Sequence, residues 1–154
     1  MKRKAYLLRV SLIGLMVALI SACSTPHLNY TIHTDGSLNP DSAGNNYAVL
    51  IRVYQLTVPD SFNTASFDDL WRHSDTVLSG TLLAQHEITL EPGESRTWSL
   101  RKENDARYTG VVAFFRDSES AHWKQVRKVN NGPIPASTEL HLHLVQNQLE
   151  LSYR

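Results

Sequence analysis

The chain has 154 residues, enough for one domain with a core of ordinary size. Its 15 Lys and Arg residues balance its 15 Asp and Glu residues, which argues against a nucleic acid or an acidic polymer as the partner. A single cysteine excludes an intramolecular disulfide, so the fold must rest on burial and backbone pairing.

The amino terminus has the pattern of a bacterial lipoprotein signal peptide. A basic start at 2–4 precedes an apolar run at 10–20, which is shorter than the about 20 residues of a membrane span. Small residues then precede Cys23, a pattern that resembles the bacterial lipobox. We predict that 1–22 is removed, that Cys23 is lipidated and that 23–27 is a short tether. The alternative is an ordinary signal peptide with Cys23 as a bystander.

The residue after the cysteine bears on the destination of the lipoprotein. Ser24 stands there rather than Asp. By analogy with lipoprotein sorting in Gram-negative bacteria, this predicts attachment to the outer membrane, with the domain on the periplasmic face.

The mature chain opens with two strands joined by a long loop. Alternation over 28–34 predicts the first strand, and the apolar run over 47–56 predicts a central strand covered on both faces. Turn-forming residues fill 35–46, which is long for a hairpin and typical of a functional or disordered loop. Its apolar Leu38 is either an anchor for a partner's pocket or a residue that folds back on its own sheet.

A change of pattern over 61–78 predicts one or two short helices. Ser61 and Ser66 are the expected caps, and apolar residues recur at spacings of three and four from Phe67 to Trp71. We expect the aromatic side chains of this insert to cover the sheet rather than to hold a cofactor.

The rest of the chain alternates as short strands with turns between them. The predicted strands are 82–90, 95–101, 108–115, 121–129, 139–144 and 149–153, and Pro92-Gly93 suits a type II turn. About eight strands predict a mainly β protein, an antiparallel β-sandwich over 28–154 with a helical insertion after the second strand.

The residues that carry chemistry do not assemble into a known site. His141 and His143 share a strand face, but no third or fourth metal ligand is evident, so two solvated imidazoles are expected. The neighbours Asp68 and Asp69 would point apart on a helix, and the carboxylates of 117–119 lie in a turn. No nucleophile elbow, free thiol or phosphate loop is present in the mature chain. We predict no enzyme activity, no metal and no cofactor.

The assembled pattern resembles the TssJ (SciN) family, the outer-membrane lipoproteins of the type VI secretion system. The match is carried by 37–41, 50–56, 65–71, 90–94 and 108–117, and it extends over nearly the whole mature chain. The most specific pieces are Arg-Val-Tyr-Gln-Leu and Gly-Val-Val-Ala-Phe-Phe-Arg-Asp.

This resemblance implies a transthyretin-like sandwich with extra helices. It also implies that the lipoprotein tethers the periplasmic carboxy-terminal domain of the inner-membrane protein TssM to the outer membrane, with no nucleic acid or small-molecule substrate. In the family, the loop between the first two strands makes the contact, which maps to 35–46 here. The candidate partner-binding residues are Ser37, Leu38, Asn39, Pro40, Asp41 and Ser42.

A different function stays open on the sequence alone. Surface aromatics, namely Trp71, Trp98 or Trp123, suit a periplasm-facing lipoprotein that binds a glycan or a peptide.

Overall fold

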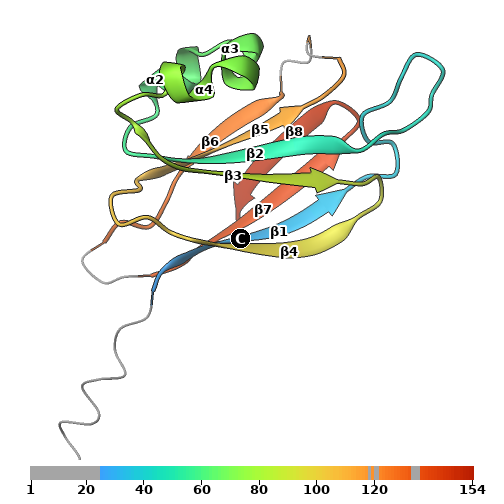
Figure 1. Ribbon diagram of the computed structural model, residues 1–154. Coiled ribbons are helices and arrows are strands. Elements are labelled where there is room, and N and C mark those ends of the chain that lie inside the picture. The colour runs from blue at the N-terminus through green and yellow to red at the C-terminus, as the bar shows by residue number, and fades with distance from the viewer. Residues whose placement is uncertain (1–24, 118, 120–121, 133–135) are drawn as a thin grey trace, which may run out of the picture.

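The computed structural model describes residues 25–117, 119, 122–132 and 136–154, and these form two four-stranded sheets packed face to face (Figure 1). The first, here the β1 sheet, has the order β4-β1-β7-β8, and the second, the β2 sheet, has the order β3-β2-β5-β6. The strands are β1 (His27–Thr34), β2 (Val49–Leu56), β3 (Leu82–Leu90), β4 (Ser95–Arg101), β5 (Tyr108–Phe114), β6 (Lys124–Lys128), β7 (Thr138–Val145) and β8 (Gln148–Tyr153).

The predicted sandwich of eight strands is confirmed, with one correction to the strand directions. Five of the six pairs among the described strands are antiparallel, but β1 pairs with β7 in parallel. This pair joins residues 110 positions apart, such as Leu28 and Thr138. Alternation gives the faces of a strand but not the direction of a distant neighbour, so the sequence pattern could not reveal it.

The main core lies between the two sheets. Val49, Ile51 and Val53 on one face of β2 are almost fully buried, in one cluster with the alternating leucines of β7. Each buried aliphatic side chain stabilises the fold by about 1.5–3 kcal/mol. Inside this layer the Tyr30 hydroxyl lies 2.6 Å from Thr109 Oγ1, which satisfies both polar groups.

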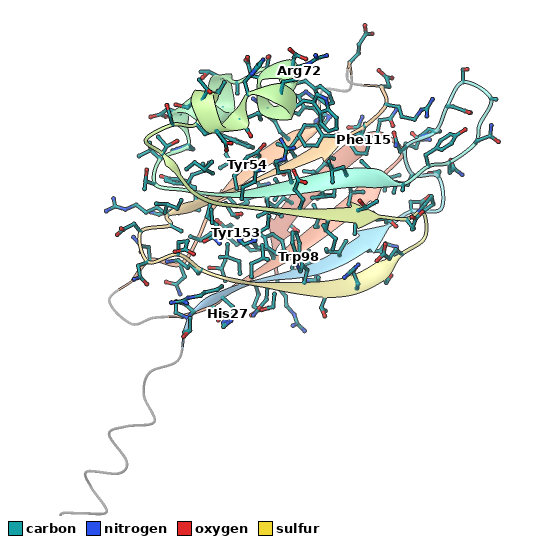
Figure 2. All side chains as sticks on the ribbon, in the orientation of Figure 1. His27, Tyr54, Arg72, Trp98, Phe115 and Tyr153 are labelled. Carbon is teal, nitrogen blue, oxygen red and sulfur yellow. The ribbon has the colours of Figure 1, made fainter. Side chains whose placement is uncertain are left out.

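A second core lies on the outer face of the β2 sheet, under α2 (Asp60–Thr64), α3 (Phe67–Arg72) and α4 (Ser74–Val77). Figure 1 shows the three helices above this sheet, and Figure 2 shows Tyr54 between the helices and the strands. Tyr54, Phe62 and Leu70 are almost fully buried there. The predicted helical insertion after the second strand is therefore confirmed.

The helix starts are partly as expected. Ser66 caps α3: its hydroxyl accepts from Asp69 N at 3.2 Å, and the Asp69 carboxylate accepts from Ser66 N at 2.9 Å. Ser61 is not a cap, because α2 begins one residue earlier at Asp60, with Pro59 in the N-cap position. Proline has no side-chain hydrogen-bonding group, so this helix start has no side-chain cap.

Two cations tie the short helices to the sheet. Arg52 donates from Nη1 to Leu70 O at 2.5 Å and from Nε to Glu87 at 2.6 Å. Lys124 Nζ donates to three carbonyl oxygens around the end of α2, those of Phe62, Asn63 and Ala65, at 2.6–2.9 Å. Helices of this length are not stable by themselves, so these contacts hold the insert in place.

Several local expectations can be compared with the structure. Gly93 has φ +74°, as a type II turn requires at that position. β6 is the edge strand next to β5, as expected, but it is shorter than the predicted 121–129. Among the described residues, no helix is both long enough and apolar enough to cross a membrane.

Candidate functional site

The loop that follows β1 lies at the opposite end of the sandwich from the start of that strand. β1 enters its sheet at His27, and the loop begins after Thr34 and crosses to β2 in the other sheet. Figure 1 shows this loop projecting from one end, while β1 begins at the other. Cys23 itself lies outside the described residues.

The first half of the loop belongs to the core. Leu38 is fully buried within the main cluster, so it is not an exposed anchor, and the alternative that it folds back on its own sheet is correct. Asn39 is also buried: its Nδ2 donates to Ala48 O at 2.8 Å, and its Oδ1 accepts from Arg116 N at 2.9 Å. These two side chains hold the loop base and leave the following residues to face solvent.

One carboxylate organises the exposed tip of the loop. Asp41 accepts hydrogen bonds from the backbone N–H groups of Ala43 and Asn45 at 2.9 and 2.8 Å, and from the side chains of Asn45 and Tyr47 at 3.0 and 2.9 Å. The hydrogen bonds from Asn45, first its side chain and then its backbone, lower the pKa of Asp41 to about 2. Gly44 takes a positive φ of +84°, which suits glycine at this tight turn. The tip is therefore a preformed turn.

An aromatic–cation pair, missed at the sequence level, flanks this tip. Tyr47 is 38% exposed, and the Arg116 guanidinium lies 4.6 Å from the centre of its ring. The sequence prediction placed Tyr47 in the second strand, but β2 starts at Val49, and the Tyr47 hydroxyl is bonded to Asp41. The apolar run could not signal this, because a half-exposed tyrosine next to a strand fits the same pattern.

The entry to the loop is fastened to the neighbouring turns. Asp35 N donates to Leu144 O at 2.8 Å, and the Asp35 carboxylate accepts from the N–H and the hydroxyl of Ser37 at 2.8 and 2.7 Å. Thr34 Oγ1 donates to Glu91 O at 2.6 Å and accepts from Glu94 N at 2.8 Å. The loop therefore leaves the sheet in a defined direction.

The histidines and carboxylates stay dispersed or become structural. His143 stacks on His33 with ring centres 5.4 Å apart, and no group of three or more metal-ligand residues comes together among the described residues. Asp68 pairs with Arg72 at 2.6 Å on an exposed helix face, while Asp69 caps its own helix.

The three tryptophans do not share one surface. Trp71 on α3 is 46% exposed and contacts Phe114, with ring centres 4.8 Å apart. Trp98 on β4 packs against the main core beside Tyr30, and Trp123 contacts aromatics of the outer core. Trp71 and the half-buried Trp123 are linked through Phe114 and Phe67, so an aromatic platform for a glycan would rest on this cluster without Trp98.

Comparisons with known proteins place the chain in a family. The family model described as "Type VI secretion lipoprotein, VasD, EvfM, TssJ" matches residues 26–148. The crystal structure of the T6SS lipoprotein TssJ1 from Pseudomonas aeruginosa is 29% identical, covers 85% of this chain and 98% of that chain, and superposes with a TM-score of 0.76. No curated protein matches the chain at the level of sequence.

Two further solved structures are similar. A chain of the structure described as the T6SS protein TssM C-terminal domain from EAEC is 26% identical, covers 83% of this chain and 98% of that chain, and has a TM-score of 0.68. A chain of the structure described as a type VI membrane complex is 25% identical, covers 85% and 99%, and has a TM-score of 0.70.

These similarities confirm the predicted family and sandwich fold. They also confirm the expected role as a structural, non-enzymatic lipoprotein of the secretion membrane complex, anchored at the outer membrane. The chain belongs to the family of type VI secretion lipoproteins that includes VasD, EvfM and TssJ.

Proposed function

We propose that the chain links the outer membrane to the periplasmic carboxy-terminal domain of a TssM-like inner-membrane protein. Lipid on Cys23 holds one end, and the loop over 35–46 binds the partner at the other. The observation that carries this proposal is that β1 begins at His27, four positions after Cys23, and ends at Thr34, where the loop starts, so the chain enters the strand at one end and the loop leaves it at the other. With eight residues, that strand is about 26 Å long, so the loop points away from the anchored end.

The partner contact falls on the exposed part of the loop. Ser42 and the residues to 46 are exposed, and Pro40 and Asp41 are partly so, whereas Leu38 and Asn39 are buried and hold the base. Tyr47 and Arg116 extend this surface beside the tip. A preformed turn favours affinity because little conformational entropy is lost when the partner binds.

A binding measurement with matched variants tests the loop. We expect Ser42→Arg/Ala43→Arg to weaken binding to the TssM-like periplasmic domain by about tenfold or more, because hot spots tolerate bulk and charge poorly. Both positions are exposed, so the melting temperature should stay unchanged. The control Thr89→Arg/Thr97→Arg adds the same charge at exposed strand positions. Equal affinity of the two double variants for the partner domain would show that the loop tip is not part of the interface.

The anchor is tested separately in cells. Cys23→Ser, still exported, should release the protein from the membrane and abolish type VI secretion. Membrane fractionation measures the first effect and an effector-release assay measures the second. Full secretion by an exported, unacylated protein would contradict the anchoring role.

A further inference from the structure

The end of the sandwich where β1 begins, here the tether end, is a closely connected set of loops. Pro26 O accepts from Lys102 N at 3.0 Å, and His27 N donates to Ser137 Oγ at 3.1 Å. Val129 N donates to Arg107 O at 2.8 Å in the opposite sheet. The segments 25–27, 101–108, 128–132, 136–139 and 153–154 therefore lie together at this end.

The two ends of the molecule differ in charge. The tether end carries Arg101, Lys102, Arg107, Lys128 and Arg154 against the carboxylates of Glu103, Asp105 and Glu139, with Asp60 at the start of α2, just after β2. The opposite end, formed by 35–47, 91–96, 115–117 and 119, carries Asp35, Asp41, Glu91, Glu94, Asp117 and Glu119 against Arg96 and Arg116. The mature chain over 23–154, which lacks the four cations of 1–22, has 11 Lys and Arg against 15 Asp and Glu, and its acidic excess lies at the loop end rather than at the tether end.

A polar pocket of about 480 Å³ opens at the tether end. It is lined by Arg107, Tyr108, Lys128 and the residues of 129–132, which include Asn130 and Asn131, with no Asp or Glu among the lining residues. An adjoining hollow of about 410 Å³ shares Lys128 and extends to Ser137 and Arg154. Because Ser137 is bonded to His27, this hollow adjoins the point where the tether enters the fold.

The cations of this pocket are available for a ligand. In the part of the chain that the structure describes, the ion pairs are Arg52–Glu87, Arg72–Asp68 and Arg96–Glu94, and none involves Arg107, Lys128 or Arg154. The acidic side chain of the adjoining hollow, Glu139, accepts instead from Asn29 Nδ2 at 2.7 Å. An arginine and a lysine beside amide side chains form a site suited to a phosphate group.

The short tether identifies the source of that phosphate. Cys23 and His27 are four positions apart, so even a fully extended tether reaches about 14 Å between their Cα atoms. With Cys23 acylated, as proposed above, the tether end stays within about two Debye lengths of the lipid headgroups. We propose that the pocket lined by Arg107 and Lys128 binds the headgroup phosphate of anionic phospholipids in the membrane that carries the anchor. This contact turns the anionic end, with the partner loop, away from the surface.

Vesicle binding by an unacylated chain tests this proposal independently of the anchor. The mature chain, residues 23–154 with Cys23→Ser, is titrated with vesicles of equal parts phosphatidylglycerol and phosphatidylcholine, and with vesicles of phosphatidylcholine alone. Binding is expected only to the anionic vesicles, and added salt should weaken it. Amide NMR signals of 129–132 should shift with dihexanoyl phosphatidylglycerol. A failure of acylation or of TssM binding in cells would leave this result unchanged.

Matched charge reversals decide whether the pocket is responsible. Arg107→Glu/Lys128→Glu should reduce binding to the anionic vesicles by about tenfold or more. The control Arg72→Glu/Arg96→Glu makes the same change in net charge on exposed residues away from the tether end, and it should keep affinity within about twofold. If the reversal impairs folding, Arg107→Gln/Lys128→Gln replaces it.

Several outcomes would overturn the proposal. Equal losses of affinity for anionic vesicles in the pocket variant and the control variant would mean that the chain is attracted nonspecifically to the charged membrane. Equal binding to both vesicle types would exclude an anionic headgroup. Release of the chain by inorganic phosphate equimolar to the lipid phosphate would mean a site for free phosphate instead of a membrane contact.

Discussion

The two faces of the β2 sheet are covered in different ways. The inner face meets the β1 sheet with aliphatic side chains such as Ile51, in a continuous layer that spans the domain. The outer face is covered by three helices of four to six residues, and cations fasten those helices through backbone carbonyls. The stability of the inner layer therefore depends on the fit and the buried area of its apolar side chains. The stability of the outer layer depends on a few hydrogen bonds from cations to backbone carbonyls.

The largest effect is expected from a cavity in the inner layer. Ile51→Ala should lower the free energy of unfolding by about 2–5 kcal/mol, because the surrounding sheets cannot close the space. Denaturant unfolding should show one transition at a lower midpoint. The control Leu83→Ala, at a position 38% exposed on β3, should cost far less. A similar loss of unfolding free energy in Ile51→Ala and Leu83→Ala would show that the inner layer contributes no more to stability than the exposed surface.

The outer layer should respond locally when a directed contact is removed. Arg52→Met keeps the apolar stem but loses the charged hydrogen bonds to Leu70 O and Glu87, which costs about 1.5–3 kcal/mol. Hydrogen exchange should rise over 60–78 more than in β2 itself. The exposed Arg72→Met, which also loses an ion pair, should cost about 0.5 kcal/mol or less. Uniform exchange across both faces would show that the insert does not open separately.

A glycine in β5 gives a finer test of the same face. A Cβ on Gly110 would lie 2.7 Å from the Phe62 ring, so Gly110→Ala should cost about 1–3 kcal/mol by displacing α2. Gly36→Ala, where a Cβ meets nothing within 4 Å, is the control. Adding Phe62→Leu to Gly110→Ala should cost less than the sum of the two single changes. Strict additivity in thermal unfolding would contradict the contact.

The stability of the two faces should also differ in its response to alkaline pH. This is the smallest of the expected effects, because it is absent at neutral pH. Burial raises the pKa of Tyr30 between the sheets and of Tyr54 under the helices. Stability that is complete below pH 10 is therefore lost as the pH rises toward the folded-state pKa values, because only the unfolded chain ionises readily.

The corresponding variants separate the two contributions. Tyr30→Phe should flatten the decline in unfolding free energy above pH 10 more than Tyr54→Phe. The Tyr54 phenol accepts from Arg52, which favours its ionised form, whereas the Tyr30 phenol is bonded to neutral Thr109. Denaturant titrations at several alkaline pH values measure the slopes. An equal slope in both variants would contradict the expected influence of the two hydrogen-bond partners, Thr109 and Arg52.

The faces differed as well in how far the sequence could predict them. Alternation in 49–53 and 140–144 predicted the inner layer, because the period of a strand assigns each side chain to a face. The cap at Ser66 was readable from spacing. The hydrogen bond from Arg52 to Leu70 O could not be predicted, because it joins a strand to a helix whose orientation no local sequence pattern gives.

The candidate site was predicted as a segment but not as a surface. Composition marked 35–46 as a long loop, and the family resemblance gave it a role. It could not show that Leu38 and Asn39 face inward, since their partners, such as Arg116, come from distant turns. That Tyr47 belongs to this surface became evident only from the structure, in which its hydroxyl donates to Asp41.

The parallel pairing of β1 has a mechanical consequence. β1 lies inside its sheet, bonded along its length to β4 on one side and to β7 on the other. A pull between an anchor at Cys23 and a partner at the loop acts along this strand. The hydrogen bonds of both ladders run across the strand, so they bear the force together in shear instead of breaking one after another. In the arrangement proposed above, β1 would therefore resist being drawn out of its sheet better than an edge strand such as β4 or β8.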